Sequence, residues 1–376
     1  MNTKATPNLS NALPFWVSLV FIPLWLFSVT MGGWWIALVP LYSTGITSVM
    51  DRFFGLSREN LSPDAEDSAL FWHRMITWIW IPMQIMVVFG SLIAIFWFDH
   101  LSTLESIFLA LATGAVAGGV GITYAHELIH QKNKVERTLG DILLATVLYG
   151  HFRTEHVLVH HRYVGTPRDV VTAKYNENIY HFLPRAMIGS LKSAWHVEAE
   201  RQKKRGHAVH DFSNPFWRYG GGALACLTLA AIIGGFGGVA LFALQALVAI
   251  SYLEIIDYVE HYGLVRKHLG DGKYEPVAPR HSWNSNHKFT NWLLINLQRH
   301  SDHHYKPSRR FPLLQTYDEA DAPQLPYGYP IMAVIACNPR HFRRMMNPKV
   351  RAWRKMYYPE ITDWQPYKDG TTPMPR

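Results

Sequence analysis

Six long apolar stretches constrain this chain more than any other feature of its sequence. They run over residues 13–30, 34–50, 75–98, 104–125, 219–233 and 236–258. A helix needs about 20 apolar residues to cross the hydrocarbon core of a bilayer, and most of these stretches come close to that length. Charged residues make up 17% of the chain, below the roughly 25% that is usual for soluble proteins. The sequence therefore predicts an all-α, polytopic membrane protein with about six transmembrane helices, paired as hairpins over 13–50, 75–125 and 219–258.

The fourth stretch is rich in glycine, at positions 114, 118, 119 and 121. Small residues let helix backbones approach one another closely in lipid. We therefore expect this helix to pack tightly against a neighbour. A shorter apolar piece at 142–149 is expected to be buried in the protein and not to cross the membrane.

Basic residues indicate which way the hairpins face. The chain has 36 Lys and Arg against 28 Asp and Glu, and none of the basic residues lies in the short connections at 31–33, 99–103 and 234–235. Positively charged loops stay on the cytoplasmic side. We expect a multi-pass protein of a bacterial inner membrane with cytoplasmic N- and C-termini and cytoplasmic segments at 126–216 and 259–376. The surplus of positive charge then reflects topology and contact with lipid headgroups, and not nucleic acid binding.

Nine of the 20 histidines fall on this same side, at the ends of apolar stretches or in the polar segments between them. They are His126, His130, His156, His160, His161, His261, His300, His303 and His304. The spacing of the last three, i, i+3 and i+4, stacks side chains on one helical face. Neutral imidazole binds iron, zinc, copper and nickel. Nine nitrogens exceed the capacity of one ion, so the pattern predicts two metals with four or five ligands each and an open position.

The two cysteines, Cys226 and Cys337, are too few for a sulfur-rich metal site. A different alternative is the segment from His126 to His130, which matches the His-Glu-x-x-His motif of zinc metalloproteases, with Glu127 as the general base. An intramembrane protease of this kind needs only one further protein ligand. It leaves most of the other histidines unexplained, and it predicts one zinc and no iron.

Several sequence blocks resemble the integral-membrane alkane 1-monooxygenases, a family within the wider group of membrane fatty acid desaturases and hydroxylases. The resemblance covers most of the chain, up to about Lys349. Its blocks are His126-Glu-Leu-Ile-His130, Gly150-His-Phe, Glu155-His156 to His160-His161-Arg162, Thr166-Pro167-x-Asp169, Tyr258-Val-Glu-His261-Tyr-Gly-Leu264, His281-Ser-Trp-Asn-Ser-Asn286 and Leu297-Gln-Arg-His300-Ser-Asp-His-His304. The histidine clusters alone indicate only the wider group. The Glu-His-Tyr-Gly and His-Ser-Trp-Asn-Ser-Asn blocks narrow it to the alkane hydroxylases.

The resemblance implies a non-haem di-iron enzyme that uses dioxygen to insert oxygen into the terminal C–H bond of an n-alkane, giving a primary alcohol in the first step of alkane degradation. The nine histidines would then bind the two irons. Candidates for orienting the imidazoles are Glu155, Asp169, Asp257, Glu260 and Asp302, with His281 and Asn284 in a block that is either structural or supports the ligands. Each carboxylate has an alternative as a surface charge or ion-pair partner. Asp257 and Glu260 are the stronger pair, because acidic groups at the end of a span are costly and usually functional.

Ser43, in the second apolar stretch, is a candidate for the substrate path. An alkane dissolves in the bilayer core, so a tunnel between the spans can carry its methyl end to the metals. Ser43 falls where members of the family can carry a bulky aromatic residue. A small side chain there predicts an open tunnel and acceptance of medium to long alkanes. Alternatively, Ser43 packs against another helix.

Electrons must come from a partner. Some relatives carry a fused rubredoxin, which needs four cysteine ligands, and this chain has two cysteines in total. We therefore expect one membrane-embedded hydroxylase domain over residues 1–376 without a fused rubredoxin, served by a separate rubredoxin and its NAD(P)H-dependent reductase. Arg340, Arg343 and Arg344 belong to a basic run that is a candidate docking surface for an acidic rubredoxin. A basic edge that contacts lipid is the alternative.

Three further hypotheses remain open at this stage. A methyl-aromatic hydroxylase of the xylene type and a fatty acyl desaturase share the histidine clusters, and their products would distinguish them. A metal transporter or a structural membrane protein does not explain why the clusters are confined to one face.

Overall fold

The computed structural model describes residues 7–375, and its regular structure is almost entirely helical. Within this part of the chain the only sheet is a two-stranded antiparallel hairpin of β1 (His268–Gly270) and β2 (Lys273–Tyr274). The described residues contain four helical stretches that are long and apolar enough to cross a membrane, at Leu9–Met31, Asp67–Trp97, Thr103–Ile129 and Phe216–His261. The expectation of an all-α membrane protein is therefore confirmed.

The first predicted hairpin is helical but irregular. Its first arm comprises α1 (Leu9–Ala12), the 3-10 helix η1 (Leu13–Val20) and α2 (Phe21–Met31). After a turn at Gly32, where φ is 60°, the second arm consists of short pieces: η2 (Gly33–Ala37), α3 (Leu38–Pro40), the π-helix η3 (Leu41–Ile46) and α4 (Thr47–Phe54). The second apolar stretch thus runs back as a broken helix, which is why it is absent from the four long ones.

The second hairpin joins α5 (Phe71–Trp97), which follows the 3-10 turn η4 (Asp67–Leu70), to a returning arm of α6 (Thr103–Val116), the π-helix η5 (Ala117–Ile122) and α7 (Thr123–Ile129). Ser102 caps α6 in a capping box with Glu105. The Glu105 carboxylate also accepts a hydrogen bond of 2.6 Å from the amide of Gly33. The tips of the first two hairpins are therefore tied together.

The third hairpin is α12 (Phe216–His261). Its backbone leaves helical geometry at Gly234 and Gly235, where φ is −141° and 58°. Gly235 has the positive φ that only glycine adopts readily, and an added Cβ at Gly234 would lie 2.3 Å from the ring of Phe96. The predicted turn at 234–235 is therefore confirmed. With α12 counted as two helices and the broken arm included, the fold is consistent with about six spans.

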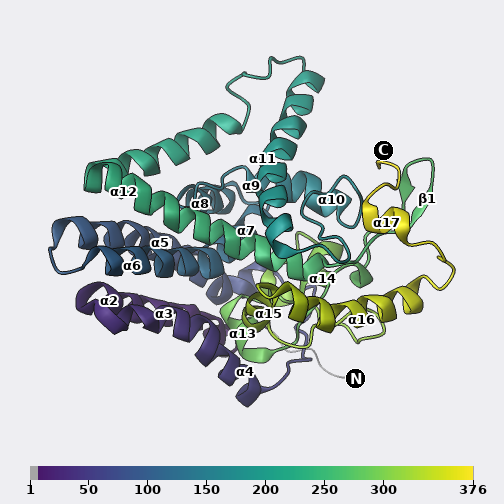
Figure 1. Ribbon diagram of the computed structural model, residues 1–376, viewed down its shortest axis with the longest axis horizontal. Helices are drawn as coiled ribbons and strands as arrows, with labels where there is room; N and C mark the ends of the chain where they lie inside the picture. Colours follow the sequence, from purple (N-terminus) through teal and green to yellow (C-terminus); the bar gives the residue numbers. More distant parts are fainter. Residues whose placement is uncertain (1–6, 376) are drawn as a thin grey trace.

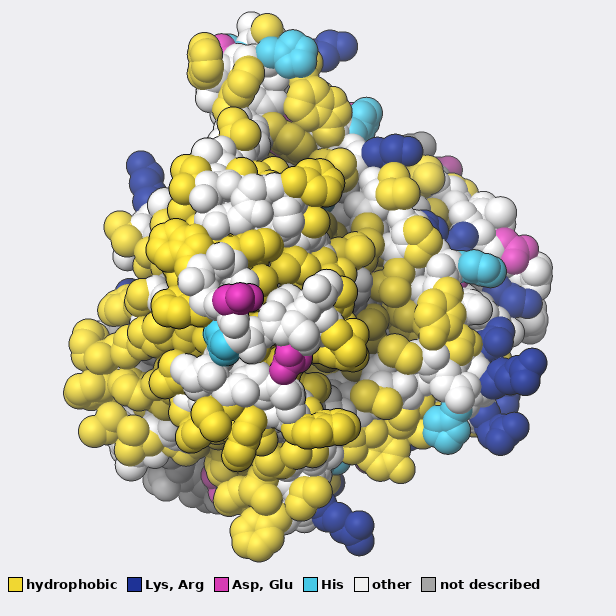
Figure 2. Space-filling model, turned by 60° about the vertical axis from the view of Figure 1, so that its left-hand side comes forward, with side chains coloured by type: hydrophobic (Ala, Val, Ile, Leu, Met, Phe, Trp, Pro, Cys, Tyr) yellow, Lys and Arg dark blue, Asp and Glu magenta, His cyan; other side chains and the backbone are white. Residues whose placement is uncertain are grey.

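The three hairpins lie side by side with their tips on one side of the molecule, at the left in Figure 1, and α16 and α17 lie on the opposite side. Figure 2 turns the tip side towards the viewer: hydrophobic side chains cover most of it, and Lys and Arg lie mainly at its edges. This distribution is what a bilayer requires, because apolar surface must face the acyl chains and charges must reach the aqueous boundary.

Close packing of the glycine-rich stretch against α12 is confirmed. A Cβ added at Gly114 would lie 2.5 Å from the carbonyl oxygen of Gln245, and one at Gly118 would lie 2.7 Å from that of Ala249. At both positions backbone touches backbone, so no larger residue fits without moving a helix.

The remaining elements gather at the ends of the hairpins, away from the tips. They are α8 (Lys134–Ala145), α9 (Phe152–Glu155), the π-helix η6 (His156–His160), α10 (His161–Tyr163), α11 (Ile179–Lys204), η7 (Pro279–His281), α13 (Lys288–Leu293), α14 (His300–Tyr305), η8 (Phe311–Leu313), α15 (Tyr329–Ala336), α16 (Pro339–Tyr357) and α17 (Gln365–Asp369). As expected, the apolar piece at 142–149 does not span the membrane. It forms the end of α8 and the turn that follows it, and Leu143, Leu144, Val147 and Tyr149 are buried there.

Candidate metal centre

All nine histidines singled out in the sequence meet in one place, at the ends of the spans. His126 lies in α7 at the end of the second hairpin, and His130 is the first residue after α7. His261 is the last residue of α12, and the other six come from η6, α10 and α14. Seven are buried and two, His130 and His161, are half-buried. Four segments far apart in the sequence therefore converge on a histidine-lined interior.

The π-helix η6 explains how one short segment supplies three of them. A π-helix repeats its hydrogen bonds at i+5, so residue 161 lies one turn above residue 156. The Nε2 atoms of His156 and His161 are accordingly 3.0 Å apart. In a regular α-helix the two side chains would point in different directions. Such π-helical turns are often found at functional sites.

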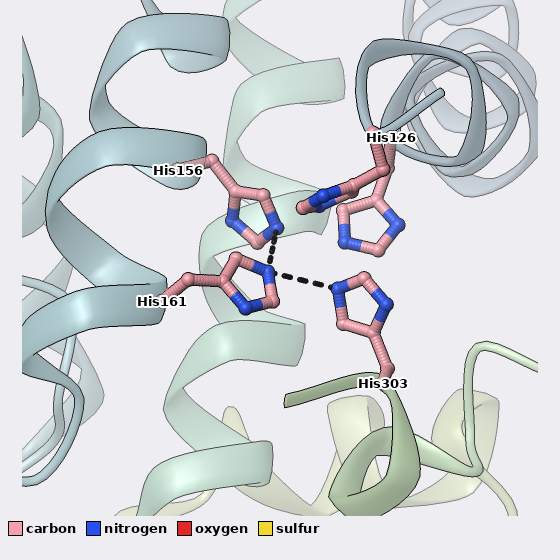
Figure 3. A group of neighbouring side chains, drawn as sticks. His126, His156, His161 and His303 are labelled. Carbon is pink, nitrogen blue, oxygen red and sulfur yellow. Dashed lines mark hydrogen bonds between the residues drawn. The ribbon is translucent and has the colours of Figure 1, made fainter. Parts of the chain in front are cut away.

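The histidines form two groups. In the first, the five-histidine group, ligand atoms of His126, His130, His156, His161 and His303 all lie within 4.8 Å of one another. Figure 3 shows four of these side chains pointing towards a common centre, with His161 between His156 and His303. The Nε2 atoms of His303 and His161 are 3.0 Å apart.

The second, the four-histidine group, consists of His160, His261, His300 and His304, all buried, with ligand atoms again within 4.8 Å of one another. The Nε2 atom of His304 lies 3.0 Å from that of His300 and 3.2 Å from that of His160. The Nε2 atoms of His261 and His300 are 3.1 Å apart. The two groups adjoin, because the rings of His161 and His304 stack with centroids 4.4 Å apart.

The donor set fits metal ions. A neutral imidazole nitrogen carries either a proton or a lone pair, so three or four Nε2 atoms that face one another cannot all be satisfied by hydrogen bonds among themselves. The Nε2 atoms of His126 and His130 are buried and have no hydrogen-bond partner among the described residues. A cation at the centre of each group would satisfy these nitrogens together. The nine histidines therefore fit a metal centre, and each of the two groups could hold an ion.

Burial keeps the imidazoles in the form that binds metal. Desolvation, followed by the electrostatic effect of the neighbouring His160, lowers the pKa of His130 to about 3. The pKa values of His300 and His303 are also held well below the ordinary range, first by burial and then by neighbouring histidines. These rings are neutral at pH 7, so their lone pairs are available to a cation.

Asp169 supports a histidine of the four-histidine group from behind. Its Oδ2 lies 3.0 Å from Nδ1 of His160 and accepts a hydrogen bond of 2.5 Å from the hydroxyl of Thr172. Burial alone would raise the pKa of Asp169, but His160 and the hydroxyl of Thr172 lower it overall. The carboxylate is therefore charged at neutral pH and fixes the ring so that Nε2 faces the centre.

Two predicted carboxylates at the end of α12 lie beside the same group. Glu260 Oε2 is 3.2 Å from His300 Nε2, and Asp257, Glu260 and His261 bring their ligand atoms within 4.8 Å of one another. Glu155 is buried next to His156, and its Oε1 has no hydrogen-bond partner. Burial, and then the charges of Asp169 and Glu254, raise the pKa of Glu155 well above the usual range. A bound cation would reverse that shift.

Glu254 is a residue that the sequence reading missed. It is buried in α12 and accepts a hydrogen bond of 2.5 Å from the hydroxyl of Tyr149. The signal was present in the sequence, because Glu254 precedes Asp257 by three residues and so lies on the same helical face, inside an apolar span.

The other predicted supporting residues hold the surrounding chain. Asn284 Oδ1 accepts a 2.8 Å hydrogen bond from the amide of Ser301, at the start of α14. Both carboxylate oxygens of Asp302 accept hydrogen bonds, from the side chain of Arg309, the amide of Gln315 and the hydroxyl of Tyr317. His281 contacts Glu275, the Ala278 amide and Tyr358. The side chains of Asp302 and His281 therefore brace the segments around the site, and the backbone of His281 also lies against the ring of His261.

The geometry of Glu127 argues against a protease. Its carboxylate accepts hydrogen bonds from the side chain of Gln131, at 2.8 Å, and from the amide of Phe311, at 3.2 Å. It is thus held against η8. A general base must reach a water at the metal, and five histidines around one centre exceed the three protein ligands of a catalytic zinc site.

Ser43 lines an apolar pocket. Its walls come from the first, second, fourth and sixth apolar stretches, from residues 293–297 and from α15, and they include Gly119, Thr123, Ile256 and Tyr329. Thr123 precedes His126 by one turn, and Ile256 precedes Asp257. The pocket therefore lies between the spans, and its wall reaches the centre through Tyr329, whose side chain contacts Glu260; the described residues that line it include no histidine.

The predicted basic surface is on α16. Arg343 and Arg344 line an open groove with Asn176, Asn347 and Arg351. Arg340 and Arg344 are exposed, and Arg343 is half-buried. In the part of the chain that the structure describes, none of the three forms an ion pair, so their charges remain available to a partner.

Apolar helical hairpins that carry two groups of histidines at one end define a membrane-bound metalloenzyme. The sequence model of the fatty acid desaturase family matches residues 102–336. Alkane 1-monooxygenase 2 of Alcanivorax borkumensis is 37% identical over 95% of this chain and 94% of its own length. Alkane 1-monooxygenase 1 of Pseudomonas aeruginosa is 40% identical over 82% of this chain and 81% of its own length. The chain therefore belongs to the fatty acid desaturase family and, within it, to the alkane 1-monooxygenases.

A more distant relative is the hydroxylase component of a xylene/toluene monooxygenase of Pseudomonas putida, which is 28% identical over 66% of this chain and 65% of its own length. The similarity to the alkane enzymes is thus both higher and longer. It favours the alkane hydroxylase over the methyl-aromatic alternative.

Proposed function

We propose that this protein is a di-iron monooxygenase that hydroxylates the terminal methyl group of n-alkanes with dioxygen and gives primary alcohols. One observation carries the proposal: an apolar pocket between membrane spans adjoins two groups of five and four histidines, in a chain that belongs to the alkane 1-monooxygenases. One oxygen atom enters the C–H bond and the other leaves as water. Two bound irons would supply the activation of dioxygen.

The nine histidines would hold the irons, five at one site and four at the other. Glu260, beside His300, offers the four-histidine site an additional oxygen ligand. Asp169 fixes the ring of His160 through Nδ1. Imidazole ligands are neutral, so the buried carboxylates Glu155, Asp169, Asp257 and Glu260, together with Glu254, offer the negative charge that balances two divalent ions. Residues of this chain thus set both the position and the charge of the centre.

The pocket would hold the alkane chain. Its lining is mostly apolar, so it takes up a hydrocarbon from the bilayer without an aqueous step. Ser43 lies on its wall, in the second apolar stretch, and the metal centre lies beside Thr123 and Ile256. We infer that the methyl end of the alkane reaches the histidines while the rest of the chain extends past Ser43. Bulk at position 43 would then limit the length of the substrate.

Electrons would come from a separate rubredoxin, which its NAD(P)H-dependent reductase keeps reduced. The exposed guanidinium groups of Arg340 and Arg344, with Arg343 beside them, form a surface to which an acidic protein is attracted. This scheme places the centre and α16 on the cytoplasmic side of a bacterial inner membrane, with both termini cytoplasmic. It also treats residues 1–376 as one hydroxylase domain.

Product analysis tests this function. Membranes that contain the protein, supplied with rubredoxin, its reductase and NAD(P)H, are given n-alkanes of several lengths, and the products are identified by mass spectrometry. We expect primary alcohols with one oxygen atom from labelled dioxygen, and none from membranes with His303→Ala. Alkenes from acyl substrates would indicate a desaturase. Turnover of xylene with no turnover of alkanes would indicate a methyl-aromatic hydroxylase.

A further inference from the structure

Helix α11 (Ile179–Lys204) has three distinct faces. One is buried against the protein and consists of Ile179, Phe182, Ala186, Ser190, Ala194, Glu198 and Gln202. A second carries exposed polar groups, among them Lys192 and His196. The third is an exposed apolar stripe formed by Tyr180, Ile188, Leu191 and Trp195, with exposed fractions of 58%, 55%, 47% and 39%. Successive members are eight, three and four positions apart, which keeps them on one side of the helix.

A stripe of this kind needs an apolar cover, because each Å² of apolar surface left in water costs about 25 cal/mol. The segment that follows α11 in the sequence indicates that this cover is lipid. After α11 the chain turns into α12, a membrane span that begins at Phe216. In this turn Phe212 and Trp217 are 88% and 53% exposed, with ring centroids 5.5 Å apart. Aromatic side chains at the start of a span lie at the bilayer surface.

The orientation of α11 agrees with this position. In Figure 1 it runs across the direction of the hairpins, close to their ends on the side of the metal centre, and then leads into the upper arm of α12. The same region projects at the top of Figure 2, where hydrophobic side chains face the viewer on the hairpin-tip side. A helix across the ends of the spans lies in the plane of the membrane boundary.

The charges on α11 complete the pattern of an interfacial helix. Its ion pairs join Arg185 to Glu177, Arg201 to Glu198 and His196 to Glu200. In the described residues, Lys192, Lys203 and Lys204 belong to no ion pair, and all three are exposed. Lysine and arginine on the polar face of an amphipathic helix reach lipid phosphates while the apolar face lies at the acyl boundary.

We propose that α11 lies in the bilayer interface on the side of the metal centre, with the stripe of Tyr180, Ile188, Leu191 and Trp195 in lipid and its lysines at the headgroups. The helix also touches the ligand-bearing chain, because Thr154 donates a 2.9 Å hydrogen bond to Glu198. Thr154 precedes His156 by two residues. Helix α11 therefore contacts both the membrane surface and the segment that carries His156, His160 and His161. This inference does not depend on the reaction.

Nitroxide scanning of the full chain in lipid nanodiscs tests the inference. Single cysteines are placed at 188, 191 and 195 and, as matched controls on the same helix, at 192 and 196, in a background with Cys226→Ser and Cys337→Ser. Electron paramagnetic resonance then compares relaxation by oxygen, which concentrates in lipid, with relaxation by a water-soluble nickel complex. We expect oxygen to dominate at the three stripe positions and nickel to dominate at 192 and 196.

Dominance of nickel at 188, 191 and 195 would overturn the inference, because the stripe would then face water. Spin–spin broadening or immobile labels at these positions would also overturn it, since they would show that a second copy of the chain or another protein segment covers the stripe. The labels report the environment of α11 whether or not alkane is oxidised, so failure of this inference is distinguishable from failure of the proposed function.

Discussion

Neighbouring histidines in this chain belong to different groups of the metal centre. His160 and His304 lie in the four-histidine group, while His161 and His303, adjacent to them in the sequence, lie in the five-histidine group. Successive residues of a helix point in different directions, so each His-His pair reaches into both groups. The paired motif thus lets one short segment of backbone contribute a histidine to each of the two groups.

Removal of His303 should disable the centre. In His303→Ala the five-histidine group loses a ring that lies 3.0 Å from His161, so we expect hydroxylation to disappear and bound iron to fall while the protein still inserts into the membrane. Iron analysis of purified protein and a turnover assay measure both. His341→Ala, at an exposed histidine outside both groups, is the control. A fully active, fully metallated His303→Ala protein would refute the assignment.

Asp169 offers a more selective test at the same scale. Asp169→Asn keeps the shape of the side chain but removes the charge that His160 Nδ1 faces. Loss of such an outer partner typically lowers metal affinity or activity by about 10- to 100-fold. We expect a loss of this size in titrations with ferrous iron. Asp211→Asn, at a half-buried carboxylate whose partners are the nearby Ser213 and His207, should bind iron as the wild type does. Equal affinity of the Asp169 variant would show that the charge is dispensable.

A bulky substitution at Ser43 tests the path of the substrate. Ser43→Trp would fill part of the pocket wall, so we expect oxidation of hexadecane to fall strongly while octane is still oxidised. Gas chromatography of the alcohols from a mixture of the two alkanes measures the ratio directly. An unchanged length profile would place the alkane elsewhere.

Most of the helical elements follow from the sequence, because span positions depend on runs of apolar side chains and turns on glycine. The predicted stretches at 75–98 and 104–125 correspond to Phe71–Trp97 and Thr103–Ile129, and the turn at 234–235 lies where the two glycines indicated it. The π-helices η3, η5 and η6 were not predictable, since no local pattern separates an i+5 turn from an α-helix. Their geometry is set by tertiary packing.

Glycine packing in the fourth span gives a prediction at the scale of this element. Gly118→Ala would place a Cβ 2.7 Å from the carbonyl oxygen of Ala249 in α12, whereas a Cβ at Gly119 meets nothing within 4 Å. Overpacking of this kind typically costs about 1–3 kcal/mol. We expect Gly118→Ala to lower the thermal unfolding temperature in detergent and Gly119→Ala to leave it nearly unchanged. Equal effects would mean that the helices have room to separate.

At the scale of the whole molecule, the histidine centre is assembled from the ends of two hairpins and from two polar segments that follow them. The sequence indicated which residues belong together, because all nine histidines lie on one side of the predicted membrane. The sequence did not show how the nine histidines divide into two groups, because the groups of five and four form only where η6 and α14 meet α7 and α12. Nor did it show that Asp302 turns towards Arg309 and Tyr317.

The basic face of α16 gives a prediction about the partner. Charge reversal in Arg343→Glu with Arg344→Glu should raise the KM for rubredoxin several-fold, with little change in kcat, and the effect should shrink with added salt because the Debye length is about 10 Å at 0.1 M. Steady-state kinetics with varied rubredoxin measure this. Lys203→Glu with Lys204→Glu, a matched reversal on α11, should leave the KM unchanged. An unaltered KM in the α16 variant would favour lipid contact for this surface.

Metal analysis of the purified protein tests the central claim most directly. If the five- and four-histidine groups each hold an iron, protein purified from membranes and loaded with ferrous iron without oxygen will contain about two irons per chain, and X-ray absorption will show nitrogen and oxygen neighbours without sulfur. A single metal per chain, or zinc in place of iron in an active preparation, would contradict the account.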